Sequence, residues 1–174
     1  MALYRIKDRK PSISEGTWIA PSAEIIGDVQ IGKNCYIGWG AILRGDYGTI
    51  IIDDETAIEE GAIIHARPMN RTEIGRRVTV GHGALIHNAV IRDFATIGMR
   101  ATVSDFSEIG EWSLVAEHAL VTRKQIIPPG KIYAGVPSKE LGDLQEKNKT
   151  EWTWAKQLYV DLAKQYLTDC SVSE

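Results

Sequence analysis

Three of the four histidines in this 174-residue chain lie between residues 65 and 87. His65 and His87 each directly follow an isoleucine, and His82 precedes His87 by five residues. Imidazole nitrogens are common zinc ligands, and three of them leave the fourth position of a tetrahedral ion open for water, as in catalytic sites. A metal held in this way can acidify the water and supply hydroxide at neutral pH. Convergence of the three side chains depends on the elements that carry them.

A period of six residues runs through most of the chain. Its nineteen leading positions are all Ile, Leu or Val, at 13, 19, 25, 31, 37, 43, 52, 58, 64, 74, 80, 86, 91, 97, 103, 109, 115, 121 and 127. This period fits neither an amphipathic helix nor a flat alternating strand, but it suits short strands joined by tight corners. Three hexapeptides then form one triangular coil. We predict an all-β fold, a single-stranded parallel β-helix, with the leaders and small residues such as Cys35 in its core.

Breaks in the repeat predict where loops interrupt the coils. The segment RGDYGTI separates Leu43 from Ile52, ARPMNRTE separates Ile64 from Ile74, and one residue is missing from the spacing after Ile86. Insertions in solenoid proteins tend to carry function. The first two segments are therefore predicted to be loops.

Beyond residue 137 the spacing of apolar residues changes to that of a helix. The residues in question are Trp152, Ala155, Leu158, Tyr159, Leu162, Ala163 and Tyr166. They predict an amphipathic helix, capped by Thr150 or a neighbour, that lies against the β-helix wall. The expected organisation is a β-helix domain at 1–137, which carries the histidines, and a C-terminal helical extension at 138–174.

The repeat also fixes how the histidines are related. Because His65 and His87 follow leaders that are both third in their coils, they should stack on neighbouring strands about 4.8 Å apart and point outward. His82 lies up to about 16 Å of extended strand before His87, on the preceding side of the triangle. We therefore expect His82 to complete the site of a neighbouring subunit in a cyclic homotrimer. The solitary His118 is interpreted as structural or superficial.

Composition excludes several classes of partner. The net charge is −3 with charges of both signs interspersed, so nucleic acid is not an expected partner. There is no run of 18 apolar residues and no apolar segment after the N-terminal charges, which argues against a membrane span and a signal peptide. Two cysteines give neither a disulfide framework nor a CxxC site. A cytoplasmic protein is expected.

From about Trp18 to Tyr166 the chain resembles the γ-class carbonic anhydrase family. The motifs are RGD at 44–46, EEGAIIH at 59–65, VTVGHGALIH at 78–87, IGMRATV at 97–103 and AGVPSK at 134–139. The resemblance implies a left-handed β-helix, a homotrimer, and a zinc site, or one of iron or cobalt, with two histidines from one subunit and one from its neighbour. It also implies that Arg44 and Asp46 form a salt bridge that shapes the site at the subunit contact.

The chain departs from the family beside the proposed metal. The family commonly has Asn-x-Gln-Asp before its first histidine, whereas Ala57, Ile58, Glu59 and Glu60 stand here, and Tyr47 replaces an acidic residue. The long acidic loop of active members is also absent. Groups around metal ligands set their orientation and the basicity of bound water. Glu59, in place of the Gln, could accept a proton as a general base.

Four functions follow from these patterns. The favoured one is hydration of CO₂ to bicarbonate by a metalloenzyme, and the second is metal-dependent hydrolysis of another small electrophile, such as a thioester. The third is a coenzyme A-dependent acyltransferase, because that class shares the hexapeptide β-helix. The fourth is a metal-bearing assembly or carrier subunit without catalysis. Two stacked imidazoles favour a metal enzyme, since a transferase needs a single base.

Overall fold

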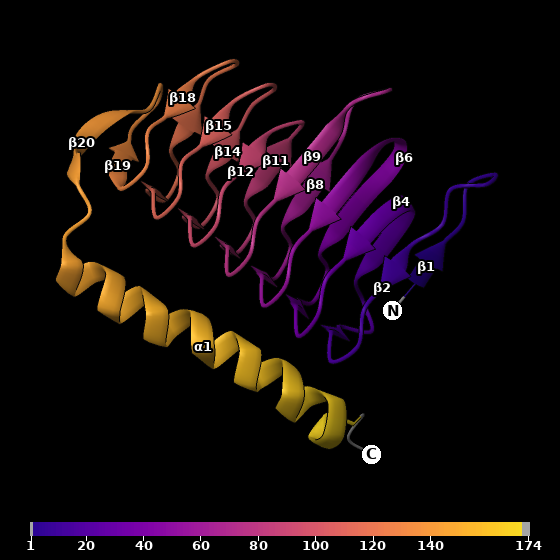
Figure 1. Ribbon diagram of the computed structural model, residues 1–174. Helices are drawn as coiled ribbons and strands as arrows, with labels where there is room; N and C mark the ends of the chain where they lie inside the picture. The colour runs from indigo at the N-terminus through magenta and orange to yellow at the C-terminus, as the bar shows by residue number, and fades with distance from the viewer. Residues whose placement is uncertain (1, 172–174) are drawn as a thin grey trace.

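The computed structural model describes residues 2–171, which form a parallel β-helix flanked by one long α-helix (Figure 1). Strands of successive coils pair in parallel, and only the last strand pairs antiparallel in this described part. The predicted fold class, an all-β hexapeptide-repeat β-helix with a C-terminal helix, is confirmed. The one helix described is too polar to cross a membrane.

Three walls make up the β-helix. The helix-covered wall consists of β3 (Trp18–Ile19), β5 (Tyr36–Ile37), β7 (Ala57–Ile58), β10 (Thr79–Val80), β13 (Thr96–Ile97), β16 (Leu114–Val115) and β19 (Lys131–Ala134), with β20 (Lys139–Asp143) added antiparallel. The histidine wall consists of β1 (Ala2–Tyr4), β8 (Ile63–His65), β11 (Leu85–His87), β14 (Thr102–Val103) and β17 (Leu120–Val121). The third wall consists of β2 (Ser12–Ile13), β9 (Arg71–Ile74), β12 (Val90–Ile91), β15 (Glu108–Ile109) and β18 (Ile126–Ile127).

The interior is filled by the residues that lead the hexapeptides. All of the leaders except the partly buried Ile13 are buried, so the predicted core is confirmed. Cys35 is fully buried among them, and burial raises the pKa of its thiol to about 11. A thiol with so high a pKa is a packing group rather than a nucleophile.

Two long strands turn the corner between the histidine wall and the third wall. β4 (Glu24–Ile31) and β6 (Ile42–Ile52) each belong to both walls, so the loop predicted at RGDYGTI is wrong: these residues continue β6. Gly27 and Gly45 make the nested bends possible. A Cβ on Gly27 would lie 2.4 Å from the Gly45 carbonyl oxygen, so only glycines allow such close backbones.

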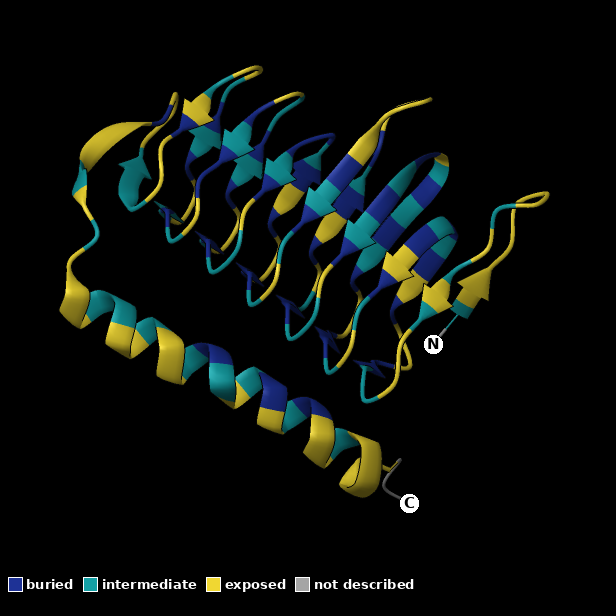
Figure 2. Cartoon of the chain, viewed as in Figure 1, coloured by how far each residue is buried: buried dark blue, intermediate teal, exposed yellow. Residues whose placement is uncertain are grey.

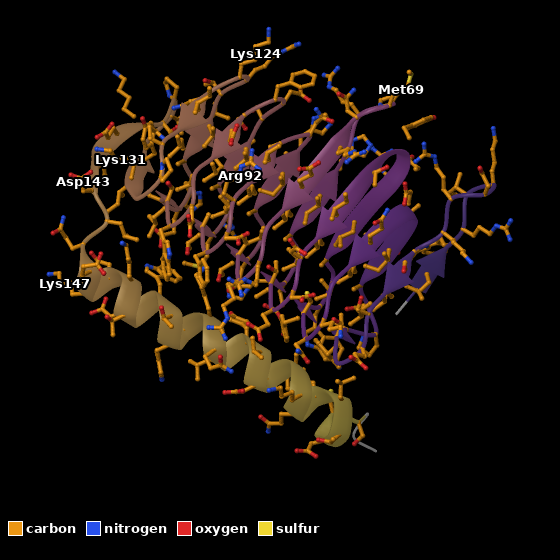
Figure 3. The ribbon with its side chains drawn as sticks, viewed as in Figure 1. Met69, Arg92, Lys124, Lys131, Asp143 and Lys147 are labelled. Atoms are coloured by element: carbon orange, nitrogen blue, oxygen red, sulfur yellow. The ribbon has the colours of Figure 1, made fainter. Side chains whose placement is uncertain are left out.

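The predicted loop between β8 and β9 is present. Met69 projects from it with 97% of its surface exposed (Figure 3). The missing residue after Ile86 shortens the corner between β11 and β12 to Asn88 and Ala89, and Asn88 keeps the left-handed φ, here 51°, that residues at the other corners adopt. The Asn88 Oδ1 accepts a hydrogen bond from the Arg67 backbone N–H at 3.1 Å, which ties the loop to the next coil.

The helix α1 (Glu146–Asp169) lies along the helix-covered wall. It begins earlier than predicted. Gln145 is the N-cap residue, and its backbone N–H donates to Asn148 Oδ1 at 3.2 Å. Thr150, the predicted cap, lies inside the helix and donates to the Glu146 carbonyl. The spacing of apolar residues did not predict this first turn, because residues 146 to 151 are all polar. Buried residues of α1 face the β-helix (Figure 2), but Leu158, predicted to pack, is exposed.

Aromatic side chains fill part of the space beneath α1. Tyr166 packs on Trp18 with ring centroids 4.6 Å apart, and Tyr159 packs on Tyr36 at 5.2 Å. The predicted division at residue 137 falls between β19 and β20, which pair with each other. Residues 1 and 172–174 of the two predicted segments lie outside the described residues.

Candidate metal centre

Arg44, His65 and His87 form a row across three coils of the histidine wall. Arg44 of β6 is the register partner of His65 in β8, and His65 is the register partner of His87 in β11. Each side chain points outward because it follows a buried leader in an alternating strand. The stacking predicted from the repeat is therefore what the structure shows.

The two imidazoles lie against each other. His65 Nδ1 is 3.0 Å from His87 Nε2, and the ring centroids are 5.0 Å apart. His65 Nε2 is buried and has no hydrogen-bond partner among the described residues. An unpartnered buried nitrogen is costly unless something else satisfies it. A metal ion is one group that would do so.

A carboxylate borders this nitrogen. Asp46 Oδ1 lies 3.4 Å from His65 Nε2, and Asp46 Oδ2 accepts a hydrogen bond from Arg44 at 2.8 Å. Burial alone would raise the pKa of Asp46, but Arg44 and the Tyr47 N–H outweigh it and the pKa is lowered. Burial, with the positive charge of Arg44 and the neighbouring His87 ring, lowers the pKa of His65. The site therefore favours an ionised carboxylate and a neutral imidazole, the form that binds metal.

A second carboxylate, which the sequence analysis missed, borders the other histidine. Asp105 Oδ1 lies 2.8 Å from His87 Nδ1 and also accepts from Arg67 Nε at 2.7 Å, while Asp105 Oδ2 accepts from Arg67 Nη2 at 3.0 Å. Asp105 follows Ser104, the residue after Val103, which is the register partner of Ile86. Counting one coil forward from His87 reaches Ser104, the residue directly before Asp105.

His82 lies apart from the pair, as the repeat predicted. It occupies the corner after β10, where its Nε2 is 3.1 Å from Glu59 Oε2 and its Nδ1 is 2.7 Å from Glu60 Oε2. Glu59 is buried and also accepts from the His82 backbone N–H at 3.1 Å. Within residues 2–171 of one chain, no three His, Cys, Asp or Glu side chains are grouped to hold a metal.

The other residues of interest lie away from the histidine pair. Ala57 is buried in β7, and His118 is exposed at a corner with a left-handed φ of 58°. The donor set of the pair is two imidazoles with a flanking carboxylate, and such ligands suit zinc, iron or cobalt. A metal ion fits this site because it would satisfy the buried His65 Nε2, which has no hydrogen-bond partner among the described residues.

Comparison with known proteins places the chain among hexapeptide-repeat proteins. Residues 10–45 match the family described as bacterial transferase hexapeptide (six repeats). The chain is 33% identical to a carbonic anhydrase of Geobacillus kaustophilus over 94% of its own length and 90% of that protein. The chain belongs to the γ-class carbonic anhydrase-like family. It is also 34% identical to the mitochondrial gamma carbonic anhydrase 2 of Arabidopsis thaliana, over 98% of this chain but 64% of that protein.

Solved structures include relatives of a different name. A Bacillus cereus protein described as a putative acetyltransferase superposes with a TM-score of 0.92 at 30% identity, over 95% of this chain and 96% of that one. The chain is thus similar both to proteins named carbonic anhydrases and to a protein named as an acetyltransferase. The side chains of the site must decide between these activities, because the fold is shared.

Proposed function

We propose that this protein is a metal-dependent carbonic anhydrase that hydrates CO₂ reversibly to bicarbonate. The observation that carries the proposal is the stacked pair of His65 and His87, with a buried Nε2 that lacks a protein partner. Relatives named carbonic anhydrases support it. Zinc is the proposed metal, with iron or cobalt as alternatives.

The third ligand in this proposal is His82 of a neighbouring subunit, in a homotrimer with one site at each contact. Two features support this assembly. One chain brings together only two of the three histidines. The histidine wall also exposes Ile63 and Leu85, at 42% and 37%, directly beside this pair. Outward apolar side chains on a strand wall are suited to burial against another subunit. The left-handed sense of the coils is the one that the family implies.

When bound, the metal would lower the pKa of water toward about 7, as zinc does in carbonic anhydrases generally. His65 and His87 would bind this metal, and the hydrogen bond from Arg44 holds Asp46 beside His65 Nε2. Asp46, kept ionised by Arg44, would accept a hydrogen bond from a hydroxyl group at this position.

Glu59 is the proposed general base, and its position agrees with the shared site. Its Oε2 lies 3.1 Å from His82 Nε2, so the subunit that supplies His82 would also bring Glu59 to the contact. A carboxylate can take a proton that the family's Gln cannot. The change from Gln to Glu59 therefore keeps a polar group at the site and adds basicity.

Acyl transfer from coenzyme A is the second candidate, because the Bacillus cereus relative named for it is 30% identical. That activity needs one base and no metal. Hydrolysis of a thioester and a carrier role without turnover would both use the metal.

The test is to purify the protein anaerobically and measure its metal content and CO₂ hydration. We expect about one metal ion per subunit, one for each contact of a trimer, with hydration that is lost in His87→Ala and kept in His118→Asn. Absence of stoichiometric metal would overturn the site. Metal without hydration would overturn the carbonic anhydrase assignment, and acetyl-CoA turnover in metal-free protein would establish the transferase.

A further inference from the structure

We propose that Asp105, held by Arg67, is a positioning residue that sets the tautomers of His87 and His65 and so leaves the metal-facing nitrogens unprotonated. The claim that Asp105 sets the two tautomers depends only on the hydrogen bonds of the structure. The consequence for metal affinity rests on the proposed function.

Asp105 is fixed from two sides. Its side chain is 15% exposed and receives both guanidinium donors of Arg67, at 2.7 and 3.0 Å. Two parallel N–H···O bonds of this kind fix orientation as well as charge. The Oδ1 atom is thereby held 2.8 Å from His87 Nδ1.

The proton positions follow in sequence along the row. An ionised carboxylate can only accept, so Asp105 requires the proton of His87 to be on Nδ1. A neutral His87 then has a lone pair on Nε2, which lies 3.0 Å from His65 Nδ1 and can accept only if that atom carries the proton of His65. His65 Nε2 is left with a lone pair, which faces Asp46 Oδ1 at 3.4 Å rather than a hydrogen-bond donor. That atom is the buried nitrogen without a partner.

This chain of bonds gives the loop between β8 and β9 a role. Arg67 belongs to that insertion, and its backbone N–H is held by Asn88 Oδ1 at 3.1 Å. Both its side chain and its backbone are thus tied to the coils that follow His65. The insertion reaches Asp105 across 38 residues of sequence and acts on His87 through this carboxylate.

A purely structural interpretation is that Arg67 and Asp105 staple the loop. The chain offers a control, since Arg92 and Glu108 form an ion pair on the third wall, at 2.7 Å, and neither forms a hydrogen bond with a histidine of the described residues (Figure 3 labels Arg92). If the Arg67–Asp105 ion pair only holds the loop, removing either carboxylate should leave the histidine tautomers unchanged. If Asp105 is a positioning residue, only its removal should change them.

The experiment uses full-length, metal-free protein labelled with ¹⁵N-histidine, whose NMR shifts report which ring nitrogen carries the proton. Wild type should show Nδ1–H for His65 and His87. In Asp105→Ala, the acceptor of the His87 Nδ1–H is removed, so the Nε2–H form of His87 should become populated. Zinc affinity should fall about 10- to 100-fold. Glu108→Ala should change neither the tautomer nor the affinity.

An unchanged His87 tautomer with unchanged zinc affinity in Asp105→Ala would overturn the proposal. Should that variant fail to fold, Arg67→Gln, at a more exposed side chain, must shift the His87 signals or the proposal fails. If wild type binds no zinc but the His87 tautomer differs between wild type and the Asp105 variant, the metal site is refuted and the positioning role stands. If wild type binds zinc and the tautomer is the same in both proteins, the positioning role is refuted and the metal site stands.

Discussion

A buried lysine under α1 predicts an unusual dependence of stability on pH. Lys156 is 2% exposed, and its Nζ donates to Thr79 Oγ1, Thr96 Oγ1 and the Ala95 carbonyl at 3.0–3.1 Å. No carboxylate of the described residues forms an ion pair with it. Burial lowers the pKa of Lys156 from 10.5 to about 7; the charge of Arg77 contributes, and that of Glu59 opposes.

The free energy of unfolding should rise with pH, because the folded and unfolded chains bind different numbers of protons. Below pH 7 the folded and unfolded chains both carry the proton, so the cost of the buried ammonium is fully present. Between about pH 7 and pH 10.5 the unfolded chain binds more protons than the folded chain, so the free energy of unfolding rises with pH. Each pKa unit is worth about 1.4 kcal/mol, which gives a gain of about 2 kcal/mol between pH 7 and pH 9.

The assay is urea unfolding of wild type, Lys156→Met and Lys164→Met at pH 7 and pH 9. Protein and metal concentrations must be held fixed, because assembly and metal binding both change apparent stability. Wild type and Lys164→Met, altered at an exposed lysine of the same helix, should gain about 2 kcal/mol more than Lys156→Met. An equal change in all three proteins would refute the reasoning.

Three further predictions concern the core, the bend and the metal. Leu43→Ala, at a fully buried leader, should lower the free energy of unfolding by about 3–5 kcal/mol, whereas Ile126→Ala, at an exposed residue, should change it by less than about 0.5 kcal/mol in urea unfolding. Gly45→Ala should cost about 1–3 kcal/mol by the same assay, because its Cβ would lie 2.4 Å from the Asp28 carbonyl oxygen. Chelation should lower stability by about 3 kcal/mol relative to protein with free metal at about 100 times Kd; calorimetry that shows no shift would contradict the site.

Much of the architecture was predictable because the repeat is strictly periodic. A leader every six residues fixed the parallel β-helix, its core and the stacking of His65 on His87. The continuous β6 was not predicted, since a phase break resembles a loop when the partner bend at Gly27 is not considered. The antiparallel β20 was missed because Lys139–Asp143 is polar and exposed, and its place depends on pairing with β19.

The groups around the site were less accessible from sequence. The ion pair of Arg67 with Asp105 joins residues 38 apart through a loop whose conformation no periodic pattern sets. Lys156 falls on the face of α1 that includes Val160 and Ala163, but lysine is usually exposed, and its three acceptors come from distant coils. Both features depend on tertiary contacts rather than on spacing.

The shared metal site is tested most directly by mixing subunits. His82→Ala and His65→Ala proteins, each expected to bind no metal at the site, are unfolded together and reassembled in equal amounts. In random cyclic trimers a contact regains His65, His87 and the partner's His82 about one time in four, so metal content should recover to about a quarter of the wild-type value. A mixture of His65→Ala and His87→Ala should recover none, because no subunit then carries the pair. Equal recovery in both mixtures, or full metal binding by a demonstrated monomer, would contradict the account.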